Sequence, residues 1–222
     1  MDLLERDPEN HRMFIDRLRG RVASRDLLLL ADFAYDLAKY GHREQFRDSG
    51  EPYFEHCRET ALILMDELGI FNPNLIITAL LHDMLEDNFL LTTWRIAWIF
   101  GDRISEMVSV LTKPKKTDKR FTNDRERHEF YFQQIERADC EVMLIKLCDR
   151  LHNLRTLDQC APEKRQRKII ETKEKYLWML ADIRYGDSPI FNGRAMETLL
   201  TPKFSRILAK LEEANRPNEI IE

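Results

Sequence analysis

The sequence predicts an all-α fold, a single-domain helical bundle, and three observations carry this prediction. Glycine and proline number only 7 and 8 among 222 residues, a share well below the roughly 12% of average proteins. Residues that favour helices, such as Leu, Glu, Lys and Arg, are frequent. Apolar residues recur at helical spacing along most of the chain, and no segment has the alternating pattern of a strand. The 43% apolar content excludes a disordered chain, and the length fits one domain.

The helices can be placed in order from their start and stop signals. An additional helix is expected in the first 20 residues, within an N-terminal extension over 1–24. The main domain covers 25–185, and a C-terminal helical tail over 186–222 packs on the core or on a partner. Asn72 is placed to cap a helix with proline in its first turn, and the segments 41–54 and 113–124 are polar loops. The predicted main-domain and tail helices are 25–40, 55–68, 73–87, 93–101, 102–112, 125–137, 139–157, 162–185 and 203–214.

Composition limits the functional classes. The net charge of −4 and the pI near 5.9 argue against a dedicated nucleic-acid binder, which usually carries a basic excess. No apolar run approaches the ~18 residues of a membrane span, and the N-terminus lacks the apolar core of a signal peptide. The cysteines form no CxxC pair, so we expect free thiols in a reducing cytoplasm rather than disulfides or a cysteine-based zinc site. These cysteines are Cys57, Cys140, Cys148 and Cys160.

A first polar cluster interrupts the apolar helix predicted at 73–87. At 100° per residue, His82, Asp83, Glu86 and Asp87 fall within an arc of about 140°. Three carboxylates on one face repel each other unless a positive charge lies among them. A divalent metal would supply that charge, because His and Asp are common ligands. The alternative is a helix end that emerges into solvent, although the helix dipole disfavours acids there.

A second polar stripe follows the helix predicted at 139–157. Five polar residues lie on one side of this helix, which is otherwise rich in Val, Ile and Leu. They are Lys146, Asp149, His152, Asn153 and Thr156. The alternative is the solvent-facing side of an amphipathic helix, which is common. The stripe gains significance only if it meets the first cluster.

The order His56, His82–Asp83, Asp149 is the H…HD…D pattern, and it resembles the HD phosphohydrolase superfamily. Two histidines and two aspartates make a mixed nitrogen and oxygen ligand set that suits Mn²⁺, Fe²⁺ or Zn²⁺. The remaining histidines have no matching context and are expected at the surface. They are His11, His42 and His128.

Longer motifs narrow the resemblance. The segments RDSGEPYFEH, HDMLED, FGDRISEMVSVLTK and IKLCDRLHNLRTL, over 47–56, 82–87, 100–113 and 145–157, are similar to the hydrolase domain of the RelA/SpoT family. The similarity covers roughly residues 25–180. Enzymes of that family remove the 3′-pyrophosphate of the alarmone (p)ppGpp.

The resemblance implies roles for individual residues. The metal ligands would be His56, His82, Asp83 and Asp149, and the catalytic acids would be Glu86 and Asp87. Contacts to the nucleotide would come from Arg47, Ser49, Asn153, Thr156 and Tyr176, and Lys146 on the same helix face could add positive charge.

The function implied is a stand-alone, metal-dependent hydrolase that converts (p)ppGpp to GDP or GTP and pyrophosphate, with Mn²⁺ as metal and Fe²⁺ or Zn²⁺ as alternatives. No P-loop is present in the sequence. Asp48 stands where many relatives carry a basic residue, so (p)ppApp and the 2′-phosphate of NADPH stay open as substrates. A non-catalytic nucleotide-binding module is a further alternative. The C-terminal helix leaves a homo-oligomer open.

Overall fold

The structure, a computed structural model, describes residues 8–87, 91–185, 191 and 195–215. These residues form helices and no strand, which confirms the predicted fold class. The α-helices are α1 (Pro8–Leu18), α2 (Arg25–Gly41), α3 (Phe54–Leu62), α4 (Pro73–Leu81), α5 (Met84–Asp87), α6 (Thr93–Phe100), α7 (Asp102–Leu111), α8 (Asp124–Glu136), α9 (Cys140–Arg155), α10 (Pro162–Lys175), α11 (Leu177–Tyr185) and α12 (Met196–Ala214).

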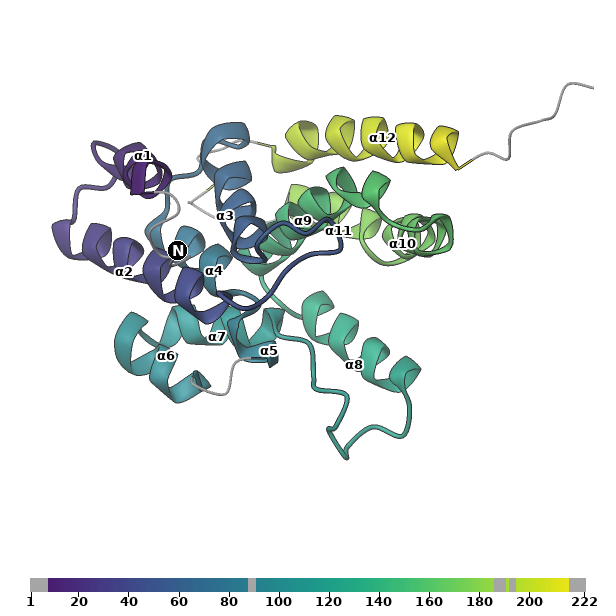
Figure 1. The fold of residues 1–222 in the computed structure, drawn as a ribbon, viewed down its shortest axis with the longest axis horizontal. Coiled ribbons are helices and arrows are strands. Elements are labelled where there is room, and N and C mark those ends of the chain that lie inside the picture. Colours follow the sequence, from purple (N-terminus) through teal and green to yellow (C-terminus); the bar gives the residue numbers. More distant parts are fainter. Residues whose placement is uncertain (1–7, 88–90, 186–190, 192–194, 216–222) are drawn as a thin grey trace, which may run out of the picture.

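Helices α3, α4 and α9 form the centre of the bundle (Figure 1). Every residue of α4 from Leu75 to Leu81 is buried, because α2, α3, α7 and α9 all pack against this helix. Helix α9 is buried along almost its whole length. Helices α10, α11 and α12 lie on the side opposite α2 and α6 in Figure 1. The helices that carry the predicted ligands are therefore the ones most enclosed by the rest of the molecule.

The helix predicted over 73–87 is broken. Helix α4 ends at Leu81, a turn at His82 and Asp83 follows, and α5 begins at Met84. The imidazole Nδ1 of His82 lies 2.8 Å from the carbonyl oxygen of Ala79, so a side chain takes a backbone acceptor at the end of α4. Adjacent residues on a straight helix point about 100° apart. The turn allows both side chains to face one point.

The helix predicted over 162–185 is divided, whereas the helix predicted over 55–68 is present and ends in a π-helical turn. The segment 162–185 is divided at Tyr176 into α10 and α11, and the buried aromatic ring lies at the division. Helix α3 continues into a π-helical turn, Ile63–Glu67.

The last helix was predicted to begin at residue 203, directly after Pro202. Helix α12 begins seven residues earlier, at Met196. Buried apolar residues continue at intervals of three and four through this proline, and they hold the longer helix against α9, α10 and α11. The tail thus packs on the core of its own chain, while 186–190, 192–194 and 216–222 lie outside the described residues. The buried residues of α12 are Met196, Leu200, Phe204, Leu208 and Leu211.

Within the described residues, no helix has the length and apolar character needed to cross a membrane. All four cysteines are free, as predicted, with Cys57 and Cys148 buried.

An ion-pair cluster attaches α12 to the bundle. Glu67 accepts hydrogen bonds from Arg155 of α9 at 2.6 and 2.9 Å, and the Lys203 ammonium of α12 lies 2.7 Å from the same carboxylate. The hydrogen bonds from Arg155 lower the pKa of Glu67 to about 2; burial opposes this shift and Lys203 adds to it. A carboxyl whose pKa is lower in the folded than in the unfolded state stabilises the fold at pH values above its ordinary pKa. This stabilisation is lost as the pH falls toward 2, where the folded-state carboxyl becomes protonated.

We expect Glu67→Gln to lower the free energy of unfolding at pH 7 by about 1 kcal/mol, because a partly exposed, networked pair is worth roughly that much. The difference from wild type should shrink between pH 5 and pH 2, where the wild-type carboxyl becomes protonated in both states. Urea denaturation at several pH values measures this, with Glu163→Gln, at an exposed residue of α10, as control. If the difference in unfolding free energy between Glu67→Gln and wild type does not change with pH, the lowered pKa of Glu67 is contradicted.

Candidate metal centre and active site

Four side chains converge between the central helices. They are His56 from α3, His82 and Asp83 from the turn between α4 and α5, and Asp149 from α9. The His56 Nε2 atom lies 3.1 Å from Asp149 Oδ1 and 3.7 Å from Asp83 Oδ2. The His82 Nε2 atom lies 3.3 Å from Asp83 Oδ2 and 3.9 Å from Asp149 Oδ1. The two predicted clusters therefore meet, and they bring together all four predicted ligands.

This arrangement fits a metal ion. Nitrogen and oxygen ligands at about 2.0–2.2 Å from a metal lie roughly 3.0–3.5 Å from one another, close to the distances observed. The Nδ1 of His82 faces a carbonyl oxygen and must carry a proton to bond it, which leaves Nε2 directed at the carboxylates. That Nε2 atom is buried and has no hydrogen-bond partner among the described residues. A buried nitrogen without a partner is costly unless a cation occupies the site.

Charges at the centre also favour a bound cation. Burial alone lowers the pKa of His82, but Asp83 and Asp149 outweigh it and raise the pKa to about 9. Burial raises the pKa of Asp83, yet the two neighbouring imidazoles hold it below its ordinary range. The carboxylates thus stay ionised and favour positive charge at Nε2, whether a proton or a metal ion.

Asp149 is held by neighbours on its own helix. The Lys146 ammonium donates to its Oδ2 at 2.7 Å, and the Asn153 amide donates to its Oδ1 at 2.5 Å. Arg47, from the loop between α2 and α3, in turn donates to Asn153 Oδ1 at 2.8 Å and to Thr156 Oγ1 at 3.1 Å. The predicted polar stripe is therefore a chain of contacts that ends at a ligand. The alternative of a solvent-facing stripe is wrong, because Lys146 and Asp149 are buried.

Histidine 152 completes the stripe. Its Nδ1 shares a 2.8 Å hydrogen bond with the Nδ1 of His56, and both rings are buried. Burial, His56 and Arg47 lower the pKa of His152 to about 3, so it stays neutral. It can accept the Nδ1 proton of His56 and so direct the His56 Nε2 lone pair at the centre.

Sequence reasoning missed three residues beside the centre. The Tyr53 hydroxyl donates to Asp83 Oδ2 at 2.7 Å. His42, expected at the surface, is buried at 3% exposure because the loop after α2 folds back, and its ring packs against Tyr53. The Cys57 Sγ lies within 4.8 Å of ligand atoms of His82 and Asp83. Contacts between segments that are distant in the sequence bring Tyr53 and Cys57 to the centre and His42 to Tyr53.

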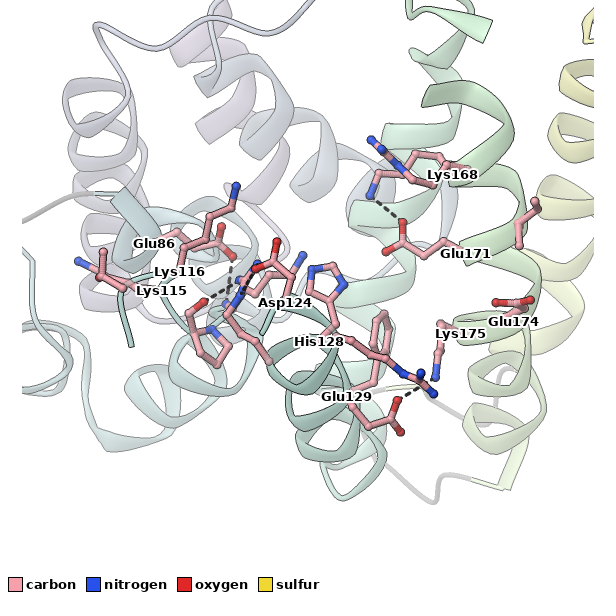
Figure 2. A pocket seen from close by; sticks show the side chains of 18 residues that line it. Glu86, Lys115, Lys116, Asp124, His128, Glu129, Lys168, Glu171, Glu174 and Lys175 are labelled. Atoms are coloured by element: carbon pink, nitrogen blue, oxygen red, sulfur yellow. Dashed lines mark hydrogen bonds and ion pairs between the residues drawn. The ribbon is translucent and has the colours of Figure 1, made fainter. Parts of the chain in front are cut away.

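Glu86 lies in the wall of a large cleft, of about 1270 Å³, between α8 and α10. Figure 2 shows Glu86 and Lys116 on one side of this cleft, Lys168 and Glu171 on the other, and His128 between them. The Glu86 Oε1 atom accepts a 3.0 Å hydrogen bond from the Lys113 backbone N–H. Burial and the Asp83 carboxylate raise the pKa of Glu86. A carboxylate with a raised pKa accepts a proton more readily than an ordinary one.

A smaller cleft of about 250 Å³ lies beside the loop between α2 and α3. Asp48, in this loop, forms an ion pair with Lys164 of α10, which lowers the pKa of the Asp48 carboxyl. A basic side chain thus faces Asp48, the position at which the family resemblance implies a basic residue. The cleft is lined by Phe46, Arg47, Asp48, Ser49, Tyr53, Arg150, Asn153, Thr156, Leu157, Cys160, Lys164 and Lys168.

Three predicted site residues remain, namely Tyr176, Asp87 and Ser49. Tyr176 is buried and lines neither cleft; its ring lies 4.3 Å from the Arg150 guanidinium and packs edge-on against Phe132. Asp87 ends α5, but its side chain lies outside the described part of the chain. Ser49 is exposed, and its hydroxyl accepts a 3.4 Å bond from the Glu51 N–H.

Residues 34–181 match the family model described as HD domain, and this span includes all four predicted ligands. The chain belongs to the HD-domain family. The described residues contain a group, His56, His82 and Asp149, that could hold a metal ion.

Relatives of this HD domain carry alarmone-related names. A Synechocystis sp. protein named "Probable guanosine-3′,5′-bis(diphosphate) 3′-pyrophosphohydrolase" is 32% identical over 193 residues, covering 81% of this chain and 24% of the relative. A Brucella melitensis protein named "GTP pyrophosphokinase rsh" is 40% identical over 150 residues, covering 66% and 19%. The chain thus spans at most about a quarter of these relatives.

The fold also has a solved counterpart. A structure titled "A metazoan ortholog of SpoT hydrolyzes ppGpp and plays a role in starvation responses" is similar at a TM-score of 0.63. The similarity covers 80% of this chain and 94% of that one, at 24% identity. It shows that the two chains share a fold.

Proposed function

We propose that this HD domain hydrolyses (p)ppGpp at the 3′ position, releasing pyrophosphate and GDP or GTP. The observation that carries the proposal is the enclosed group of two histidines and two aspartates. In this group the buried His82 Nε2 makes no hydrogen bond to any described residue and lies 3.3 Å from Asp83 Oδ2. The Synechocystis relative is named for this reaction. The substrate, the reaction and Mn²⁺ as the metal are all part of the proposal.

The four predicted ligands would hold the metal. A bound divalent ion supplies a Lewis acid and a water of lowered pKa. Glu86, fixed by the Lys113 N–H, is placed to take a proton from the attacking water. Water adds to the phosphorus bonded to O3′, the P–O3′ bond breaks, and O3′ gains a proton. Asp87 is proposed as the second acid on sequence grounds.

In this proposal, the two clefts bind different parts of the nucleotide. Cationic side chains outnumber acidic ones in the large cleft, which suits phosphate groups close to Glu86. The small cleft contains Arg47, Ser49, Asn153 and Thr156, the residues predicted to contact the nucleotide. Lys146 acts on the substrate only indirectly in this proposal, because its ammonium bonds Asp149.

A chelation experiment tests the proposal. The protein is stripped of metal, Mn²⁺ is restored, and ppGpp is followed by anion-exchange chromatography. We expect GDP and pyrophosphate to form only when metal is present. Turnover of ppApp or NADPH without turnover of ppGpp would support the metal centre but show that the substrate is a different nucleotide. If none of the three nucleotides is hydrolysed while metal is demonstrably bound, the proposed reaction is refuted and a non-catalytic nucleotide-binding module is the remaining interpretation.

We expect Arg47→Ala to raise the Michaelis constant for ppGpp about tenfold or more, since a hydrogen bond to a charged group is worth roughly 1.5–3 kcal/mol. The variant also removes the donors that hold Asn153 and Thr156 in the small cleft. Steady-state kinetics measure the effect, with Arg43→Ala in the same loop as control. An unchanged Michaelis constant and rate would exclude this role.

A further inference from the structure

Tyr53 connects the loop between α2 and α3 to the metal centre. Its hydroxyl donates to Asp83 Oδ2 at 2.7 Å. The same oxygen lies 3.3 Å from the His82 Nε2 and 3.7 Å from the His56 Nε2. The hydroxyl therefore bonds the carboxylate oxygen that faces the ligand site.

The tyrosine ring is fixed in this position from several sides. It packs edge-on against the His56 ring at 5.7 Å and lies 5.0 Å from the buried His42 ring. The Tyr53 N–H donates to the Gln45 carbonyl at 2.9 Å, and the Gln45 side chain bonds His42. The Arg47 guanidinium lies 6.0 Å from the ring centroid. A side chain held in this way presents its hydroxyl at a defined point.

Asp83 requires such a contact because it lies in the turn between α4 and α5. Its carboxylate also lies within 3.7 Å of the Nε2 atoms of His56 and His82, which are themselves predicted ligands. Among the described residues, Tyr53 thus contributes a contact to Asp83 from outside the ligand set. Partners of this kind orient metal ligands, and their loss typically weakens metal affinity 10–100-fold.

We propose that Tyr53 is a positioning residue of the metal centre, whose hydroxyl holds the Asp83 carboxylate in the orientation that binds the ion. The inference rests on the metal centre of the proposed function. It assigns to Tyr53 an effect on metal affinity that is present before any substrate binds.

Tyr53→Phe tests this inference, because it removes the hydroxyl and keeps the ring against His42 and His56. Isothermal titration of metal-free protein with Mn²⁺, and with Zn²⁺ in parallel, measures the dissociation constant. We expect the constant to rise 10–100-fold. Tyr40→Phe, which removes the hydroxyl of an exposed ring on α2, should leave it unchanged. A value for Tyr53→Phe within twofold of wild type would overturn the inference.

A second measurement separates positioning from folding. The melting temperature is recorded with and without saturating Mn²⁺, because a ligand stabilises the fold according to its affinity. At one fixed Mn²⁺ concentration, the metal-induced rise should be smaller in Tyr53→Phe than in wild type, whatever the stability of the metal-free protein. An equal rise would overturn the inference. Absence of metal binding by the wild-type protein would instead refute the metal centre itself.

Discussion

Asp83→Ala is expected to abolish metal binding and hydrolysis together. The Asp83 carboxylate is ionised, only 14% exposed, and within 3.7 Å of both predicted histidine ligands. Its removal takes one oxygen ligand and one negative charge from a buried site. A catalytic metal contributes several kcal/mol of charge stabilisation, so its loss should lower the rate roughly 1000-fold or more.

Metal analysis after gel filtration and the rate of ppGpp hydrolysis measure the two effects on the same sample. Asp118→Ala, which removes a carboxylate from the loop before α8, serves as the control and should leave both unchanged. Circular dichroism verifies that the helices remain. Wild-type metal content and full activity in Asp83→Ala would refute the ligand assignment.

Helical periodicity placed His82 and Asp83 together correctly but predicted a continuous helix where the structure has a turn. The positions of His82 and Asp83 within one arc indicated a shared site, and their side chains do lie close together, beside His56 and Asp149. The periodicity could not predict the turn between α4 and α5, because that turn depends on a hydrogen bond between the His82 imidazole and the Ala79 carbonyl. The pattern of apolar residues does not reveal where a side chain competes with backbone N–H groups for a carbonyl acceptor.

The neighbours of the ligands were less accessible to sequence reasoning. The spacing of Lys146 and Asn153 around Asp149 predicted one helix face, since all three share α9. Tyr53 contacts Asp83, and His42 packs against Tyr53, only because the loop between α2 and α3 folds over the centre. A loop has no periodicity that fixes its path. The signal that could have found them was the density of polar residues in this loop next to a ligand.

Glu86→Gln is expected to keep the metal and lose turnover by about 100-fold or more, the scale of a positioned acid or base. The amide oxygen can still accept the Lys113 N–H, so the local structure should persist, but an amide cannot take a proton from water. The rate constant at saturating ppGpp should fall, and the dissociation constant for Mn²⁺ should stay within twofold of wild type.

The matched control is Glu129→Gln. Glu129 lines the same cleft as Glu86, and its carboxylate pairs with Lys175 at 3.3 Å (Figure 2). If the cleft acted only through its overall charge, the two variants would change the rate similarly, because each removes one negative charge. If Glu86 moves a proton, only Glu86→Gln should be slow. Equal rates for Glu86→Gln and wild type would show that Glu86 takes no part in the reaction and would move the general base to Asp87.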